Sequence, residues 1–203
     1  NHDEAVQLLI GLEEINVNQA EDNGWTALLW ASEKGHLDIV KLLLGVEGVN
    51  VNQANNNGVT ALFIASERGH SDVVKLLLSM EETDVNQARD IGATALIIAS
   101  ENGHSDVVIL LLSMEEIDVN QARDTGVTAL FIASENGHSD IVKLLLSVES
   151  ININQAMNDG RTALVIAKQV LRRGRTLNDG TAEHYNAEAW RKIIRLLTNA
   201  GAQ

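Results

Sequence analysis

The stretch "NGVTALFIASERGHSDVVKLLL", Asn57 to Leu78, occurs four times with small changes in a chain of 203 residues. A turn glycine marks the same point of each copy, and its successive occurrences are 34 residues apart: Gly24, Gly58, Gly92, Gly126 and Gly160. A fixed period of this length is typical of repeat arrays, in which similar units stack side by side. The length of the chain therefore reflects the number of units and not the size of one central core.

The first half of each unit predicts a short amphipathic helix. In "TALFIASE", which begins at Thr60, the apolar residues Leu62, Ile64 and Ala65 fall on one helical face. Gly69 follows this segment, at a position suited to the positive φ that ends many helices. We therefore expect a helix that begins after Thr60 and ends at Gly69.

A second helix is expected directly after the first. Ser71 and Asp72 stand at its start, where a hydroxyl or a carboxylate can accept hydrogen bonds from free backbone N–H groups. Its apolar side is made of Val73, Val74, Leu76, Leu77 and Leu78. Helices of eight to ten residues are unstable alone in water, so stacking against neighbouring units must hold them.

The rest of each unit lacks a helical apolar period. The segment 79–92 ends in Asp90, Ile91 and Gly92, which predicts an extended arm and a tight turn into the next unit. Two helices and a projecting hairpin thus make one layer of the predicted structure.

The pattern resembles the ankyrin repeat over nearly the whole chain. The residues that carry the resemblance recur in register, as in Gly58, Thr60, Leu62, Ala65, Gly69, His70, Val74, Leu77, Leu78, Val85 and Asn86. The resemblance implies an all-α solenoid of stacked antiparallel helix pairs with β-hairpin-like loops. It also implies a concave side, lined by the hairpins and the first helices, that binds other proteins.

One position departs from the ankyrin pattern in every unit. The slot that holds a hydrogen-bonding histidine in the family is apolar here, at Leu29, Phe63, Ile97, Phe131 and Val165. We expect apolar packing to replace the hydrogen bonds of that slot.

We expect residues 1–203 to form a single ankyrin-repeat domain, which the period divides into repeats. A partial N-terminal repeat, 1–16, supplies a second helix only, and a C-terminal capping repeat, 153–203, carries an insertion at about 168–192. In the capping repeat we expect a lengthened first helix, an exposed loop and a longer closing helix. The full repeats are 17–50, 51–84, 85–118 and 119–152.

Composition limits the classes of partner and compartment. The net charge is −13, with 7 Lys and Arg against 25 Asp and Glu up to Asp159 and 8 against 3 from Arg161 onward. An acidic surface repels nucleic acid and favours a protein partner with a basic or basic-apolar segment. No apolar run approaches the roughly 20 residues of a membrane-spanning helix, so we expect no membrane insertion. The absence of cysteine favours a cytoplasmic or otherwise intracellular location. We also expect the protein to be a monomer.

The repeated histidines and acidic pairs do not indicate an enzyme. Five histidines occupy one position of the repeat, and side chains on helices about 8 to 10 Å apart cannot share one zinc ion. We predict that they are structural and donate hydrogen bonds from one layer to the next: His2, His36, His70, His104 and His138. The sequence "GHSD" lacks the strand-to-helix turn of a hydrolase, and the Glu pairs of the connecting arms fit a solvated edge. We predict no catalytic site, no cofactor and no metal.

The candidate binding residues lie beside each turn glycine and at the end of each first helix. The resemblance places these positions in the groove: Asp22, Asn23, Trp25, Glu33, Lys34, Asn57, Val59, Glu67, Arg68, Ile91, Glu101, Asn102, Val127, Glu135 and Asn136. Trp25 is the expected anchor of an apolar row that extends to Val127, because exposed aromatic residues are frequent at binding hot spots.

A carboxylate row and a basic cluster complete the candidate surfaces. Glu33, Glu67, Glu101 and Glu135 would form one row of carboxylates along the groove, able to receive Arg or Lys. A secondary surface is predicted at Arg172, Arg173 and Arg175, where three arginines lie near a turn and could hold a phosphate or a carboxylate.

The leading function is therefore noncatalytic protein–protein binding through the concave groove. Two alternatives stay open at this point: a regulatory or targeting region of a larger enzyme or channel, and an engineered repeat scaffold. The irregular insertion favours a natural array over an idealised design.

Overall fold

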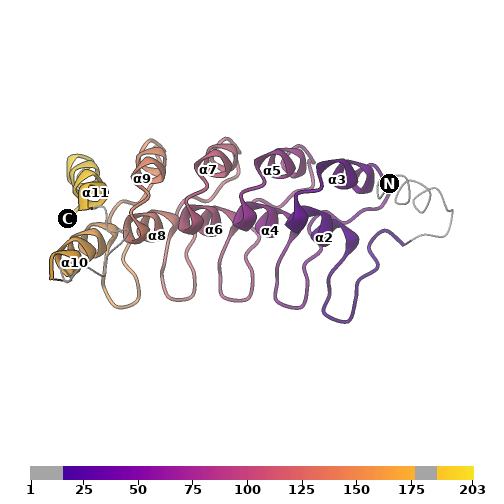
Figure 1. The fold of residues 1–203 in the computed structure, drawn as a ribbon, viewed down its shortest axis with the longest axis horizontal. Helices are drawn as coiled ribbons and strands as arrows, with labels where there is room; N and C mark the ends of the chain where they lie inside the picture. The colour runs from indigo at the N-terminus through magenta and orange to yellow at the C-terminus, as the bar shows by residue number, and fades with distance from the viewer. Residues whose placement is uncertain (1–15, 177–186) are drawn as a thin grey trace.

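The computed structural model describes residues 16–176 and 187–203, which form two rows of α-helices (Figure 1). The first helices of the layers make one row: α2 (Ala27–Lys34), α4 (Ala61–Arg68), α6 (Ala95–Asn102), α8 (Ala129–Asn136) and α10 (Ala163–Thr176). The second helices make the other row: α3 (Leu37–Leu44), α5 (Ser71–Leu77), α7 (Ser105–Leu112), α9 (Ser139–Leu146) and α11 (Ala187–Asn199). The all-α solenoid of stacked helix pairs is confirmed. The partial repeat 1–16 lies outside the described residues except for Asn16.

Local sequence signals set both ends of the first helices. The Oγ1 of Thr60 accepts a hydrogen bond from the backbone N–H of Phe63 at 3.1 Å, which caps the start of α4. Gly69 ends α4 with a φ of 73°, and its N–H reaches the carbonyls of Ala65 and Ser66. The same threonine cap and glycine end recur in α2, α6 and α8.

The second helices begin differently from the expectation. The N-cap residue of α5 is His70, not Ser71 or Asp72, and its side chain makes no capping hydrogen bond. The His70 side chain instead hydrogen-bonds to the backbone carbonyl of Glu33 in the preceding layer. Contact between layers therefore takes the place of a local cap.

Apolar packing fills the slot that lacks the family's histidine. Leu29, Phe63, Ile97 and Phe131 expose at most 2% of their surface and belong to one continuous core between the two rows. Arg89 of the next hairpin lies 5.4 Å from the centre of the Phe63 ring. The predicted replacement of hydrogen bonding by packing at this slot is confirmed for these four residues.

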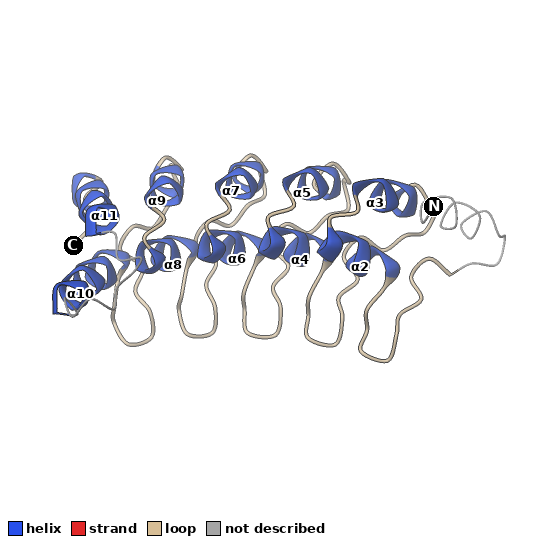
Figure 2. Ribbon diagram, in the orientation of Figure 1, coloured by secondary structure: helices blue, strands red, loops and turns tan. Residues whose placement is uncertain are grey.

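The connecting arms form hairpin-like loops that all extend on one side of the row of first helices (Figure 2). Among the described residues, strand pairing is limited to isolated bridges, at Ala20 with Thr26 and Ala122 with Thr128. Backbone hydrogen bonds also join the tip of each hairpin to the next. Examples are Asn56 N–H to the Asn23 carbonyl at 3.1 Å and Asn158 N–H to the Thr125 carbonyl at 3.0 Å.

An asparagine at the base of each arm bridges two layers. The Nδ2 of Asn86 donates to the carbonyl of Glu116 at 2.7 Å, and its Oδ1 accepts from the N–H of Asp118 at 2.8 Å. Asn18, Asn52 and Asn120 make the same pair of bonds with their own neighbours. Because each amide satisfies one donor and one acceptor of the following layer, this side chain fixes the spacing of the arms.

The last layer has longer helices than the others. α10 has 14 residues and α11 has 13, against 7 or 8 in the preceding helices. These lengths agree with the lengthened first helix and the longer closing helix expected from the insertion. The exposed loop expected between these two helices lies outside the described residues.

Candidate binding face

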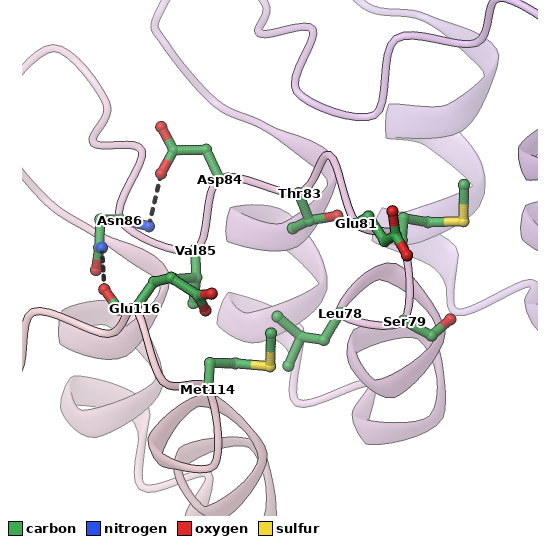
Figure 3. A pocket seen from close by; sticks show the side chains of 10 residues that line it. Leu78, Ser79, Glu81, Thr83, Asp84, Val85, Asn86, Met114 and Glu116 are labelled. Carbon is green, nitrogen blue, oxygen red and sulfur yellow. Dashed lines mark hydrogen bonds between the residues drawn. The ribbon is translucent and has the colours of Figure 1, made fainter.

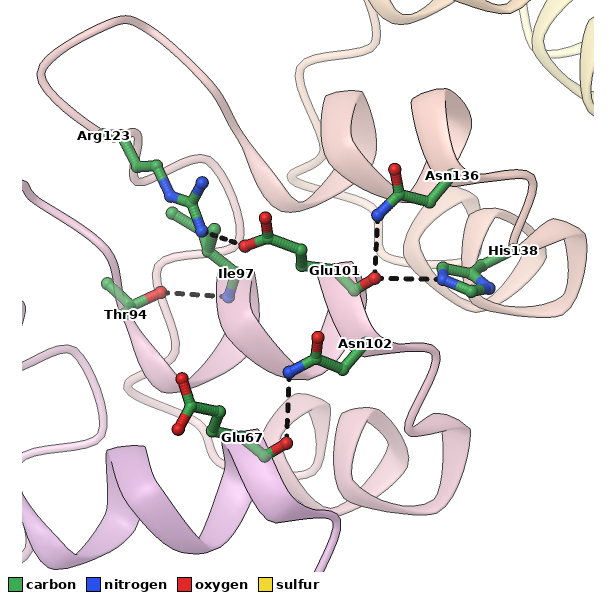
Figure 4. A network of polar contacts seen from close by, with 8 residues as sticks. All are labelled: Glu67, Thr94, Ile97, Glu101, Asn102, Arg123, Asn136 and His138. Carbon is green, nitrogen blue, oxygen red and sulfur yellow. Dashed lines mark hydrogen bonds and ion pairs between the residues drawn. The ribbon is translucent and has the colours of Figure 1, made fainter.

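A repeated hydrogen bond connects the end of each first helix to the next layer. The Nε2 of His138 lies 3.0 Å from the carbonyl of Glu101 (Figure 4). His104 repeats the contact with Glu67 at 3.0 Å, and His70 repeats it with Glu33 at 2.9 Å. A carbonyl only accepts, so Nε2 carries the proton in each imidazole. The predicted structural role of these three histidines is confirmed.

Two of the candidate binding asparagines share this network. The Nδ2 groups of Asn102 and Asn136 donate to the carbonyls of Glu67 and Glu101, at 3.1 and 2.8 Å (Figure 4). Each carbonyl therefore receives two donors, one from an asparagine and one from a histidine. Both asparagines are exposed, but their amide N–H groups are engaged within the chain.

The row of glutamates is partly neutralised. Arg68 of the next layer donates to the Glu33 carboxylate at 2.9 Å, and Lys34 lies 3.3 Å from it. Burial opposes ionisation of this carboxyl, of which only 14% is exposed, but the hydrogen bonds from Arg68 and Lys34 outweigh it and hold the pKa of Glu33 below its ordinary value. Glu33 is therefore charged and already paired.

Glu101 is paired as well, through a residue that the repeat pattern did not single out. Arg123, in the following hairpin, forms an ion pair with it (Figure 4). Within residues 16–176 and 187–203, ion pairs involve Glu33 and Glu101 but not Glu67 or Glu135. Of the four carboxylates expected to face a partner, two thus have a cation of this chain beside them.

The expected apolar row is wrong at Val59 and Val127. Each exposes 8% of its surface and belongs to the core, and Ala93, at the equivalent position of the layer between them, exposes 1%. The residue after the turn glycine closes the hairpin through its carbonyl, as Val59 does with the N–H of Asn55. Its side chain packs in the core instead of facing solvent.

Two tryptophans form an apolar pair in the same layer, with Trp25 just before α2 and Trp30 on it. The ring centres of Trp25 and Trp30 are 4.4 Å apart, and Trp30 is 40% exposed. The Trp30 indole donates to Glu21 at 3.2 Å, and the ammonium of Lys34 lies 5.9 Å from its ring centre. Trp30 was missed by the sequence reasoning, although a signal existed. The other layers carry an isoleucine at its position: Ile64, Ile98, Ile132 and Ile166.

The hairpin tips present exposed side chains of changing identity. In the first four layers of the described structure the residue before the turn glycine is Asn23, Asn57, Ile91 or Thr125, and all four are exposed, Ile91 by 49%. The preceding Asp22, Asp90 and Asp124 are exposed as well. We use the name hairpin face for these tip residues together with Trp25, Trp30 and Lys34.

The secondary basic surface lies in the last layer. Arg172 and Arg173 are exposed on α10, and Arg191 and Arg195 are exposed on α11. The side chain of Arg175 lies outside the described residues. In the described part of the chain, no helix is long and apolar enough to span a membrane.

Comparison with known proteins agrees with this architecture. The family model of ankyrin repeats matches residues 1–89, 46–123, 79–157 and 96–173. Among solved structures, the chain is similar to the ankyrin repeat protein EF0377, with 26% identity and a TM-score of 0.81 over 97% of this chain and 91% of that one. A search of curated proteins finds no match.

Proposed function

The chain belongs to the ankyrin-repeat family, and we propose that it is a noncatalytic module that holds a partner protein on its hairpin face. Ankyrin repeats are generally protein–protein interaction modules and are typically noncatalytic. The proposal adds the surface used and the character of the partner.

The proposal rests on one observation: the hairpins are joined to one another by backbone hydrogen bonds, while the exposed side chains at their tips differ from layer to layer. Backbone hydrogen bonds join successive hairpin tips, while the side chain before each turn glycine changes from Asn23 to Asn57, Ile91 and Thr125. A surface that is already ordered loses little conformational entropy on binding. Variation in polarity at exposed tip positions, where no packing requires it, suits recognition better than it suits folding.

The charge of this face favours a basic or basic-apolar segment of the partner. Three tip carboxylates, at Asp22, Asp90 and Asp124, project from different layers, while Ile91 and the Trp25–Trp30 pair supply apolar contact. Tryptophan is among the residues that most often dominate binding energy. We further propose that the module acts inside the cell, since a chain without cysteine suits a reducing compartment. We propose in addition that it acts as a monomer.

The test is affinity capture from an extract of the source cell, with quantification of each captured protein. The test bait carries Trp30→Ala and Ile91→Lys, two substitutions at exposed side chains, and a control bait carries Thr198→Lys, at an exposed position of α11 on the opposite row of helices. We expect at least one protein to be retained by the unmodified and control baits and lost from the test bait. An identical set of proteins on all three baits, with circular dichroism showing that each is folded, would contradict the proposal.

A further inference from the structure

One second helix interrupts a row of lysines. Lys41, Lys75 and Lys143 occupy the same position of α3, α5 and α9, and all are exposed. α7 carries Ile109 at this position, with 50% of its surface exposed. The exposed isoleucine gives this helix an apolar side chain where the other layers present a charged one, and its neighbourhood then decides whether it belongs to a larger apolar surface.

The arm between α5 and α6 shows a second departure in the same region. The repeat places an aliphatic residue, partly buried against the core, at Val49, Ile117 and Ile151. Thr83 occupies this position after α5, and its hydroxyl donates to the Leu77 carbonyl at 2.6 Å. An open pocket of about 470 Å³ lies here (Figure 3).

The apolar part of the pocket lining is adaptable. Leu78, Met80, Val85 and Met114 line it, and the two methionines come from the arms of successive layers. Methionine side chains are flexible and polarisable, so they adjust to the shape of a ligand. This composition suits the insertion of one aliphatic or aromatic side chain.

A second, smaller depression of about 250 Å³ lies along the same pair of helices, beside Lys75, Ile109 and Leu110. On a helix, residues three or four apart share a face. Lys75 and Leu78 are therefore neighbours on one side of α5, and Leu110 and Met114 occupy the matching stripe along α7 and just beyond its end. The two depressions thus lie at the two ends of one seam between these helices, which we call the α5–α7 seam.

The charges around the seam define the ligand. Five carboxylates border the two depressions, against the single ammonium of Lys75: Asp72, Asp106, Glu81, Asp84 and Glu116. We propose that the α5–α7 seam is a second docking surface, on the opposite row of helices from the hairpin face, for a protein segment in which Lys or Arg flanks an aliphatic or aromatic side chain. One apolar side chain of the segment fills the Met80–Met114 pocket, a second packs on Ile109, and the flanking cations approach the carboxylates. This inference does not depend on binding at the hairpin face.

The experiment uses the 15N-labelled chain and a short synthetic peptide built from Lys and Leu around one Trp. The same peptide with Glu in place of Lys serves as the charge control. We expect amide shifts to change at Ile109, Leu110 and Met114, with the Lys peptide only. Thr83→Ile restores the residue type of the other layers, adds no charge and fills the pocket, and we expect it to weaken binding roughly tenfold.

A matched pair of lysine substitutions separates the apolar contact from bulk charge. Ile109→Lys and Thr198→Lys change the net charge equally, and Thr198 is exposed on α11, outside both the α5–α7 seam and the hairpin face. We expect only Ile109→Lys to weaken peptide binding at the seam, followed through the amide shifts of Leu110 and Met114, by roughly tenfold or more. Equal effects of the two substitutions, undiminished binding to Thr83→Ile, or no shifts at the seam would each overturn the proposal. Peptide binding at the hairpin face would instead shift Ile91 and Trp30, so the two surfaces are measured separately.

Discussion

The middle layers and the last layer make the same contact with different side chains. In the middle layers the carbonyl of a glutamate receives the imidazole of a histidine 37 residues later. In the last layer the carbonyl of Glu135 receives the indole N–H of Trp190, 55 residues later, at 3.2 Å. A glycine faces the donor ring in both cases: Gly103 faces His138, and Gly137 faces Trp190. The acceptor and the glycine therefore define a slot for a flat ring with an N–H group, whatever helix supplies the ring.

The largest effect is expected from Trp190→Ala, which removes the ring from this slot. Deletion of a large aromatic side chain leaves a cavity, and here also an unpaired carbonyl, so we expect the last layer to lose about 3 kcal/mol. Urea unfolding, followed by circular dichroism, measures the total loss of unfolding free energy. Amide hydrogen exchange in α10 and α11 shows whether that loss falls in the last layer. Trp30→Ala removes an exposed indole and is the control, with an expected loss of about 1 kcal/mol or less. Equal losses in the two variants would contradict the role given to Trp190.

The slot glycines provide the next test. Gly137→Ala places a Cβ 2.9 Å from the Trp190 ring, whereas Gly160→Ala has a similar φ, 84° against 81°, and no neighbour within 4 Å. Both variants carry the left-handed backbone penalty of about 1 to 2 kcal/mol. We expect Gly137→Ala to lose a further 1 kcal/mol or so from overpacking. The comparison of the two unfolding free energies isolates the contact, and equal values would show that the ring moves aside freely.

The bridging asparagines differ between the middle and the end of the stack. Asn86 makes two hydrogen bonds to the next layer, whereas Asn154 accepts one from the N–H of Gln203 at 2.8 Å. We expect Asn86→Ala to reduce the unfolding free energy by about 1 to 2 kcal/mol, and Asn154→Ala by about half as much. Thermal unfolding of the two variants, measured side by side, checks the ratio of their losses of unfolding free energy. A larger loss from Asn154→Ala would contradict the bridging role of Asn86.

The smallest effect concerns the ion pair between α9 and α11. The hydrogen bond and charge of Lys192, 2.9 Å away, hold the pKa of Asp140 below its ordinary value of 3.8. A carboxyl with a lowered pKa stabilises the fold above that ordinary value, and the contribution disappears as the pH falls through the lower value of the folded state. The pair is exposed, so Asp140→Asn is expected to lose less than about 1 kcal/mol at neutral pH and nothing at strongly acid pH. Unfolding curves across this range, at low and high salt, provide the check. A loss that persists in acid would exclude the ion pair as its cause.

Local rules made much of the fold predictable. The period, the apolar faces and the positive φ of Gly69 follow from residues a few positions apart, which is the range over which helices are decided. The histidine contact was predictable too, because one residue recurring at one position of each layer requires an explanation that works once per layer.

The binding face was less predictable because it depends on contacts between layers. The burial of Val59 follows from how its hairpin packs, and the pairing of Glu101 with Arg123 joins residues 22 positions apart in different layers. Trp190 lies 52 positions after His138, one period of 34 plus 18 inserted residues, so it stands at the histidine position of the last layer. The change of residue type and the insertion hid this role from a search for residues repeated every 34 positions. Trp30 could have been found by comparing the five layers position by position, since it is the member that differs.

The asparagine and histidine contacts also bear on how such a chain changes length over generations. Every middle layer offers the same donors to one neighbour and the same acceptors to the other. Removal of a whole period, such as residues 85–118, would bring the carbonyl of Glu67 to His138, while Asn52 would keep its bonds to Glu82 and Asp84 and Asn120 its bonds to Ser150 and Asn152. No donor or acceptor of the frame would be lost. Unequal recombination can therefore lengthen or shorten the stack in whole layers while each product still folds, and selection can then act on the exposed tips alone.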